Sequence, residues 1–169
     1  TKFNIINTFD EADFFLMTRP LTVDMEYVNK LKEGRIDEIA PCTRCLHCHI
    51  GSNEANAQMA YCRVNALTQR VMREGGPATY ELEPAATPKK VMVIGGGPAG
   101  MEAARIAAAR GHNVTLYEKR GALGFMLDFA ASVKGPHENL ADLKNYLIRQ
   151  LELNGVEVKT GTEVTQELI

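Results

Sequence analysis

All four cysteines of this 169-residue chain lie between residues 42 and 62, and this clustering constrains the fold more than any other feature. Cys42, Cys45 and Cys48 recur at every third residue, and Cys62 follows after a further loop. Three thiolates at this spacing can converge on one centre, and a fourth from beyond a short loop can complete the ligand set. The spacing therefore predicts a [4Fe–4S] cluster held by these four residues.

Two other uses of the cysteines stay open. Structural zinc sites usually offer two separated Cys-x-x-Cys pairs, whereas here three cysteines come in one run and one comes alone. A redox-switch disulfide within the cluster is the second alternative. A Rieske-type site is rejected, because Asn65 stands where the second histidine would be needed after Cys62. His47 and His49 are therefore interpreted as loop residues near the site.

The composition excludes several classes of partner. The 19 Lys and Arg residues against 21 Asp and Glu give a formal net charge of −2, which offers no basis for binding nucleic acid or an anionic membrane. No apolar run approaches the roughly 20 residues of a membrane span. The first residues lack the pattern of a signal peptide. We therefore expect a cytoplasmic chain without nucleic-acid or membrane partners, in which clustered cysteines bind metal rather than form disulfides.

A second motif, Gly95-Gly-Gly97-Pro98-Ala99-Gly100, directly follows an apolar run. Gly95 allows a tight turn, Gly97 lets the backbone approach a pyrophosphate, and Gly100 lets the following helix pack closely on a sheet. Pro98 suits the first turn of that helix. Amide groups at the start of the helix, including that of Ala99, would then meet the phosphates.

An acidic residue, Glu118, ends the second apolar run of this region and is followed by Lys119. An acid at this spacing is expected to bind the ribose hydroxyls of a dinucleotide, and it disfavours a 2′-phosphate. The motif therefore predicts a site for FAD, NAD or ADP rather than for NADP.

Apolar periodicity gives a coarse set of elements and four segments. Strands are predicted at 14–17, 91–94, 114–117 and 156–158, and helices at 25–33, 66–73, 98–110 and 140–151. Asp24 and Asn139 are the expected caps of the first and last of these helices. The predicted segments are an N-terminal piece (1–40), a cysteine loop (41–76), a linker (77–88) and an α/β part (89–169).

The fold class predicted from these elements is α/β, with a partial doubly wound, Rossmann-like parallel sheet. Three parallel strands would leave much apolar surface uncovered, and the isolated strand at 14–17 has no partner strands. We therefore expect the chain to be a piece of a longer protein, or to pack against other chains.

The chain resembles the C-terminal part of the iron–sulfur flavoenzymes typified by bacterial 2,4-dienoyl-CoA reductase and trimethylamine dehydrogenase, which are related to old yellow enzyme. The resemblance runs in order from about Glu11 to the end of the chain. It rests on Ala12-Asp-Phe-Phe-Leu-Met-Thr-Arg-Pro-Leu, Arg35-Ile-Asp-Glu-Ile, the four cysteines, Cys62-Arg-Val-Asn, the glycine motif, and Gly111-His-Asn-Val-Thr-Leu-Tyr-Glu118.

This resemblance implies three parts of a larger enzyme. Residues 1–40 would be the last strand and helix of a TIM barrel that holds FMN, with Arg19 contacting the FMN phosphate. The cysteine loop would follow, and residues 89–169 would bind FAD or ADP, with an NAD(P)H domain inserted in the full-length protein. Two positions depart from the family pattern: Thr18 replaces a glycine, and Phe125 replaces the second glycine of a Gly-Gly pair.

The function implied is a part of an oxidoreductase in which NAD(P)H reduces FAD, and single electrons pass through the cluster to FMN for reduction of an enoate or 2,4-dienoyl substrate. One alternative is an electron relay of the amine dehydrogenase type. Another is a non-catalytic module that combines a zinc or cluster loop with an adenine-nucleotide site. No catalytic residue is assigned, and the chain alone is expected to be inactive.

Overall fold

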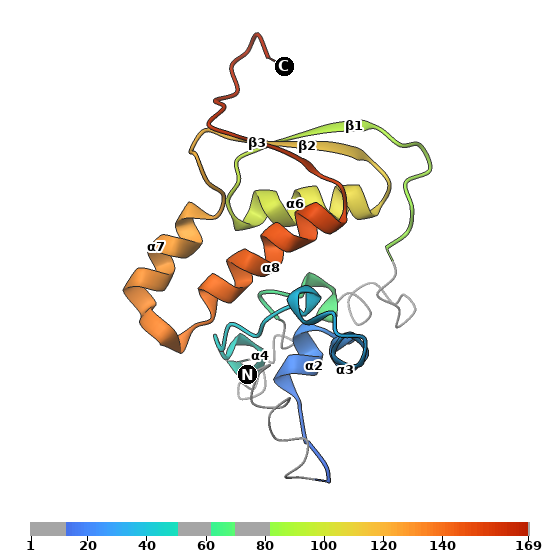
Figure 1. Ribbon diagram of the computed structural model, residues 1–169, viewed down its shortest axis with the longest axis vertical. Helices are drawn as coiled ribbons and strands as arrows, with labels where there is room; N and C mark the ends of the chain where they lie inside the picture. Colours follow the sequence, from blue (N-terminus) through green and yellow to red (C-terminus); the bar gives the residue numbers. More distant parts are fainter. Residues whose placement is uncertain (1–12, 51–61, 70–81, 169) are drawn as a thin grey trace.

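The computed structural model describes residues 13–50, 62–69 and 82–168, which form two lobes. The cysteine lobe, residues 13–50 and 62–69, holds short helices only. The α/β lobe, residues 82–168, holds the sheet and the long helices. Figure 1 shows the sheet at one end of the molecule, the helices of the cysteine lobe at the other, and α8 between them. The elements of the cysteine lobe are α2 (Arg19–Val23), α3 (Tyr27–Lys32), η1 (Ile36–Glu38), α4 (His47–Ile50) and η2 (Ala66–Gln69).

The α/β lobe is a three-stranded parallel sheet in the order β1-β2-β3. Strands β1 and β2 pair in parallel, with Lys90 opposite Asn113, and β2 and β3 pair in parallel, with Thr115 opposite Glu157. A crossover connection joins each strand to the next. The predicted α/β class, its three strands and its two long helices are confirmed. The elements are β1 (Lys90–Ile94), α6 (Pro98–Ala109), β2 (Asn113–Glu118), α7 (Phe125–Lys134), η3 (Gly135–His137), α8 (Leu140–Leu153) and β3 (Glu157–Thr160).

The core of this lobe lies between the sheet and its helices. Val114 and Leu116 of β2 are almost fully buried against Met101 of α6 and Leu151 of α8. Alternate residues of a strand point to opposite faces, and helical residues three or four apart share one face, so these side chains meet in a single layer. The burial of this layer is the main source of stability for the lobe.

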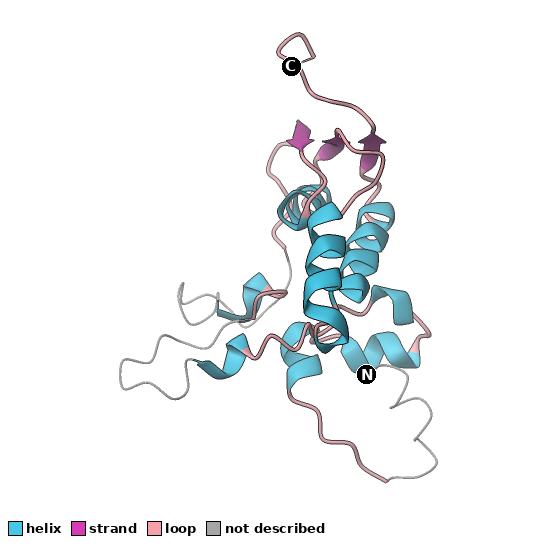
Figure 2. Cartoon of the chain, turned by 90° about the vertical axis from the view of Figure 1, so that its left-hand side faces the viewer, coloured by secondary structure: helices cyan, strands magenta, loops and turns pink. Residues whose placement is uncertain are grey.

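The other face of the sheet is uncovered in the part of the chain that the structure describes. Figure 2 shows the strands edge-on with the helices on one side only. Met92 is 38% exposed and Ile94 60% exposed, because they alternate with Val91 and Val93, which pack on the core. A continuous apolar run such as residues 91–94 is typical of a strand covered on both faces. Among the described residues only one face is covered, because α6 and α8 both pack on it, and the uncovered apolar surface expected for three parallel strands is present.

The prediction of a strand at 14–17 is wrong. These residues form no strand, and Phe14 and Leu16 are 91% and 103% exposed. A strand is stabilised by hydrogen bonds to a neighbouring strand, and no described residue offers one here. The chain instead becomes helical at Arg19, in the short helix α2, which the sequence had not predicted.

The buried carboxylate of Asp24 connects several segments of the cysteine lobe. It accepts hydrogen bonds from the amides of Glu26 and Ala40 at 3.0 and 2.9 Å, and it pairs with Lys30 at 2.7 Å. The helix predicted to start after Asp24 is present but shorter, as α3. Of the helix predicted at 66–73, residues 66–69 form the 3₁₀ turn η2, and the rest lies outside the described residues.

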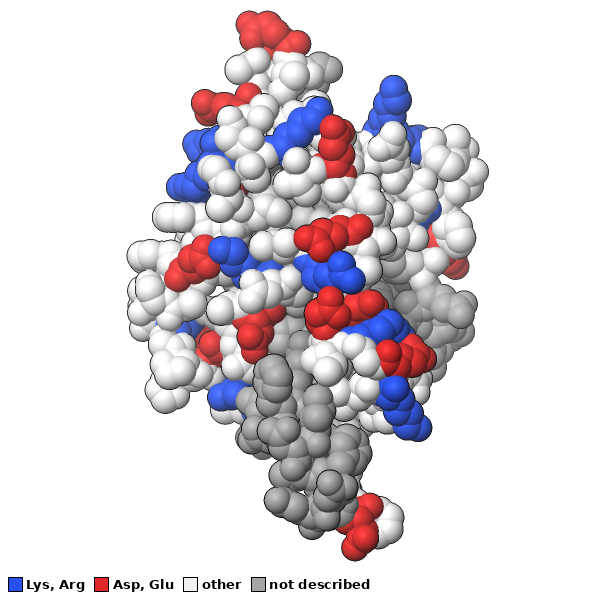
Figure 3. Space-filling model, in the orientation of Figure 1, with Lys and Arg blue, Asp and Glu red and all other residues white. Residues whose placement is uncertain are grey.

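Helix α8 joins the two lobes. At its start, the Asn139 side-chain amide donates a hydrogen bond to the carbonyl oxygen of Cys42 at 3.0 Å. Further along, Arg149 pairs with Asp37 of η1 at 2.7 Å. Acidic and basic side chains are interleaved over the surface shown in Figure 3. Among the described residues, no helix has the length and apolar character needed to cross a membrane.

Candidate functional site

The four cysteines line one small cavity, of about 20 Å³, in the cysteine lobe. All four are free thiols. Three reach the cavity from the loop and from the start of α4, and Cys62 reaches it from the segment before η2. The described residues hold no set of three or more His, Cys, Asp or Glu side chains already gathered at metal-binding geometry. The four predicted ligands therefore line one cavity, and their role as cluster ligands stays a prediction.

The loop between these cysteines has an unusual backbone. Arg44 and Leu46 adopt φ angles of 58° and 57°, in the left-handed region that costs a residue with a side chain about 1–2 kcal/mol. They are the only such non-glycine residues in the described part of the chain. They flank Cys45, so the backbone is left-handed on both sides of this cysteine. Strain of this kind is concentrated at functional sites, where the surrounding structure over-determines it.

Cys62 is held by the turn that follows it. Its sulfur accepts a hydrogen bond from the amide of Asn65 at 3.4 Å, and its own amide donates to the Thr68 hydroxyl at 3.1 Å. Burial raises the pKa of the Cys62 thiol; the amides of Asn65 and Val64 oppose this, and nearby Cys45 and Cys42 add to it. Cys42 and Cys45 thus act electrostatically on Cys62, and the amide of Asn65 points at its sulfur.

Arg19 lies at the start of α2 and lines the same cavity as the cysteines. Its predicted place was the end of a barrel strand. Because residues 14–17 form no strand, Arg19 instead begins a helix beside the cysteine loop. Its predicted contact with an FMN phosphate is untested.

The glycine turn lies at the carboxyl end of β1, directly before α6. Gly95 has a φ of 103°, which favours glycine, and its amide donates to the Tyr117 carbonyl at 2.8 Å. A Cβ at Gly100 would lie 1.9 Å from the Gly95 carbonyl oxygen, so a side chain there has no room. A Cβ at Gly97 would meet nothing within 4 Å. The two glycines thus differ: one is required by packing, and the other borders open space at the start of α6.

Pro98 and Ala99 form the first turn of α6, where backbone amides have no partner within the helix. Such a helix start favours negative charge. In parallel sheets, ligands bind beyond the carboxyl ends of the strands. The glycine turn lies both at the start of a helix and at the carboxyl end of a parallel strand.

The carboxylate of Glu118, at the end of β2, closes over this turn. It accepts hydrogen bonds from the amide of Gly96 at 2.7 Å and from the amide of Arg120 at 2.8 Å. The amide of Arg120, followed by that of Gly96, holds the pKa of Glu118 below its usual value, although burial acts in the opposite direction. An ionised carboxylate has about four acceptor positions, so it can still receive a ribose hydroxyl. Lys119 is exposed beside it.

Sequence reasoning noted Phe125 as a departure from the family pattern, but it did not predict that the loop before α7 borders the glycine turn. The amide of Gly124, at the start of α7, donates to the Gly96 carbonyl at 2.8 Å, and the Arg120 guanidinium lies over the Phe125 ring, 4.0 Å from its centroid. The available signal was Gly121 and Gly124, three and six residues after Glu118. The starts of α6 and α7 therefore lie together at the end of β1.

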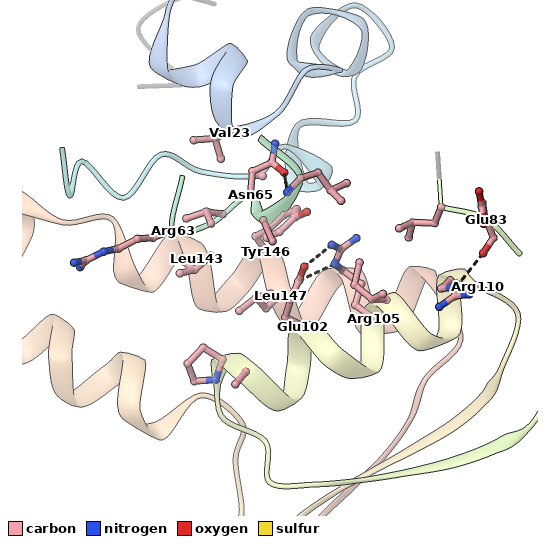
Figure 4. Close-up of a pocket in the computed structure, with 18 residues that line it drawn as sticks. Val23, Arg63, Asn65, Glu83, Glu102, Arg105, Arg110, Leu143, Tyr146 and Leu147 are labelled. Atoms are coloured by element: carbon pink, nitrogen blue, oxygen red, sulfur yellow. Dashed lines mark hydrogen bonds and ion pairs between the residues drawn. The ribbon is translucent and has the colours of Figure 1, made fainter. Parts of the chain in front are cut away.

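A larger pocket, of about 670 Å³, separates α6 and α8 from the segment that follows Cys62 (Figure 4). Arg63 and Asn65 line it on one side, and the bidentate pair of Arg105 and Glu102, with bonds of 2.8 and 2.6 Å, lines it on the other. Burial raises the pKa of Tyr146 of α8, which also lines it. Pro98 of the glycine motif borders the same space, so the pocket lies between the two predicted sites.

Known proteins match this chain over most of its length. Residues 69–167 match the family described as pyridine nucleotide-disulphide oxidoreductase. An NADH oxidase of Thermoanaerobacter brockii is 40% identical over 158 residues, which are 94% of this chain and 23% of the relative. A cinnamate reductase of Clostridium sporogenes is 37% identical over 169 residues, with the same coverage of both chains. The chain thus spans about a quarter of the length of these relatives.

Solved structures agree. A 2-naphthoyl-CoA reductase complex superposes with a TM-score of 0.82 at 35% identity, over 98% of this chain and 24% of that one. A histamine dehydrogenase from a Rhizobium species gives a TM-score of 0.76 at 25% identity, over 98% of this chain and 25% of that one. Both groups of enzymes named in the predicted resemblance are represented, reductases and amine dehydrogenases, and the resemblance is confirmed.

Proposed function

Because this chain belongs to the pyridine nucleotide-disulphide oxidoreductase family, we propose that it is the electron-relay portion of an iron–sulfur flavoprotein oxidoreductase. The observation that carries the proposal is the convergence of Cys42, Cys45, Cys48 and Cys62 on one cavity, in the same chain as a glycine turn at the carboxyl end of a parallel sheet. Cluster-binding loops and dinucleotide sites occur together where single electrons and hydrides are exchanged.

The residues of the cysteine lobe fit a [4Fe–4S] cluster in kind and number. Four free thiols line one cavity, an amide hydrogen bond reaches the Cys62 sulfur, and Arg44 and Leu46 on either side of Cys45 have a left-handed backbone. Hydrogen bonds to cluster sulfurs and limited solvent exposure are what a protein uses to tune such a group. When bound, the cluster would accept and pass on single electrons.

The residues of the turn fit the diphosphate of FAD or ADP. Gly97 leaves open space at the start of α6, Pro98, Ala99 and Gly100 give the first helical turn, and Glu118 has acceptor capacity left for the ribose. Lys119 adds a positive charge beside it. In this proposal the chain binds and orients the adenosine diphosphate part of the cofactor.

The whole enzyme would take NAD(P)H and a small enoate or 2,4-dienoyl substrate, with FMN bound in a barrel and its phosphate near Arg19. The similarity to a cinnamate reductase and to a 2-naphthoyl-CoA reductase supports this choice of substrate. The similarity to a histamine dehydrogenase and to a dimethylamine dehydrogenase of Hyphomicrobium supports the alternative of an amine dehydrogenase relay.

Iron and sulfide analysis after anaerobic reconstitution tests the cluster. The expected result is about four of each per chain, with a broad visible absorption that Cys62→Ser removes or reduces. One zinc per chain without sulfide would contradict the proposal and favour a non-catalytic zinc module. Calorimetric titration with ADP tests the nucleotide site separately, and absence of binding would contradict that half.

A further inference from the structure

Arg120 occupies a defined place beside the glycine turn. Its amide donates to the Glu118 carboxylate at 2.8 Å, and its carbonyl oxygen accepts a hydrogen bond from the amide of Gly161 at 2.8 Å. It therefore lies beyond the carboxyl ends of both β2 and β3. Its backbone is fixed from two sides, while the residue itself is exposed.

The side chain of Arg120 is positioned by Phe125. The guanidinium carbon lies 4.0 Å from the centroid of the ring, which is stacking distance. Phe125 is the first residue of α7, and the preceding Gly124 is bonded to the Gly96 carbonyl at 2.8 Å. The guanidinium is thus tied to the same turn that Glu118 closes.

Burial and ion pairing do not explain this pair. Phe125 is 46% exposed, so much of its ring gains nothing from burial. Within the described residues, Arg120 forms no salt bridge that would hold its guanidinium in place. A planar cation with one face on an aromatic ring has its other face available, and guanidinium planes stack well on aromatic rings and on nucleobases.

We propose that Arg120 is the adenine-binding residue of the nucleotide site, with the base stacked on the guanidinium face that Phe125 leaves open. The inference rests on the proposed nucleotide site and adds its base-recognition element. The adenine base and the hydroxyls that Glu118 would bind are attached to the same ribose. The base must therefore lie within a few ångströms of the Glu118 carboxylate, and the residue bonded to that carboxylate is Arg120. Phe125 acts as a positioning residue for the guanidinium.

The test compares ADP with UDP, which shares the ribose and diphosphate but presents a smaller ring. Titration calorimetry on the 169-residue chain is expected to give tighter binding of ADP. Arg120→Lys keeps the charge and loses the plane, so ADP should bind about tenfold more weakly while UDP changes little. The matched control is Arg110→Lys, at the far end of α6, which should leave both affinities unchanged.

A second pair of variants tests the role of Phe125. Phe125→Leu keeps an apolar side chain but removes the ring, and it should weaken ADP binding by about two- to fivefold. Phe129→Leu, one turn further along α7 and 56% exposed, should bind ADP as the parent chain does. Fluorescence of etheno-ADP gives an independent readout, because stacking quenches it in the parent chain and Arg120→Lys should restore it.

Three results would overturn the inference. Equal weakening of ADP and UDP in Arg120→Lys would assign the arginine to the diphosphate. An unchanged ADP affinity in that variant would remove it from the site. A parent chain that binds ADP and UDP equally well would show that the base is not recognised. A parent chain that binds neither nucleotide contradicts the proposed nucleotide site itself, so the two failures are distinguishable.

Discussion

The side-chain amide of Asn139 donates a hydrogen bond to the carbonyl oxygen of Cys42 at 3.0 Å, although the two residues are 97 positions apart. Asn139 occupies the N-cap position of α8 but makes no capping bond to its own helix. Its amide instead holds the first cysteine of the cysteine loop. The geometry of that loop therefore depends on a helix of the other lobe.

Asn139→Ala is expected to loosen the cysteine loop more than the sheet. Loss of this part-buried hydrogen bond should lower the free energy of unfolding by about 1–2 kcal/mol. Hydrogen exchange should speed up at residues 42–46 and stay slow in β1 and β2. Asn154→Ala is the control, because its amide bonds only to Gln150 within α8. Equal exchange rates in both variants would show that the bond does not hold the loop.

Two glycines of the same turn should respond in opposite ways. Gly100→Ala places a methyl group 1.9 Å from the Gly95 carbonyl oxygen and should destabilise the fold by about 3 kcal/mol. Gly97→Val meets open space, so the fold should persist while ADP binding is abolished by methyl groups in the phosphate position. Thermal unfolding by circular dichroism and ADP calorimetry separate the two effects. ADP binding by a folded Gly97→Val chain would contradict the site.

The left-handed backbone of Arg44 makes its response to glycine unusual. Arg44→Gly should leave the free energy of unfolding unchanged or raise it by up to about 1 kcal/mol, because glycine adopts positive φ without strain. Arg44→Val should lower it by about 1–2 kcal/mol, because a branched side chain resists that conformation. The control is Arg63, an exposed arginine without positive φ, where glycine should destabilise slightly. Urea unfolding measures all three.

The depressed pKa of Glu118 makes stability depend on pH in a defined direction. The amides of Arg120 and Gly96 stabilise the ionised carboxylate only in the folded chain. This contribution is present above the unfolded pKa of about 4.3 and is lost as pH falls through the lower folded pKa. Glu118→Gln should therefore be less stable than the parent at pH 7, and the difference should shrink towards pH 3. Urea midpoints at both pH values measure it, and a constant difference would contradict it.

The 169-residue chain alone should not reduce an enoate or oxidise an amine. Such chemistry needs a flavin ring beside a substrate pocket, and a barrel cannot be closed by short helices alone. In the described part of the chain, α2 and α3 are the elements that precede the cysteine loop, apart from the turn η1. The measurement is loss of cinnamate absorbance with NADH under anaerobic conditions. A rate above that of free flavin would contradict the assignment of catalysis to another part of the enzyme.

Local patterns predicted the α/β lobe well. The apolar runs before Gly95 and Glu118 form β1 and β2, and the segment from Pro98 forms α6. These elements could be predicted because the hydrophobic periods of strands and helices involve residues that are close in sequence. The four cysteines line one cavity, while their role as cluster ligands stays a prediction.

Features that depend on distant residues were not predictable. The run at 14–17 has the composition of a strand, but a strand needs a neighbour that the described residues do not supply. Helix α7 was not predicted, because its apolar residues do not form one stripe: Leu127 is buried, whereas Phe125 and Phe129 are exposed. Asn139 was predicted as a helix cap, and only the fold reveals that its side chain bonds to Cys42 instead.

The uncovered face of the sheet affects how the purified chain will look to common probes. Met92 and Ile94 lie on a fully formed strand and remain open to solvent. Dyes such as ANS become fluorescent on apolar surface of this kind, and that signal is normally taken as a sign of a molten globule. Here a native, cooperatively folded chain is expected to give it. Near-ultraviolet circular dichroism and a sharp unfolding transition, rather than dye binding, will therefore be the criteria of correct folding.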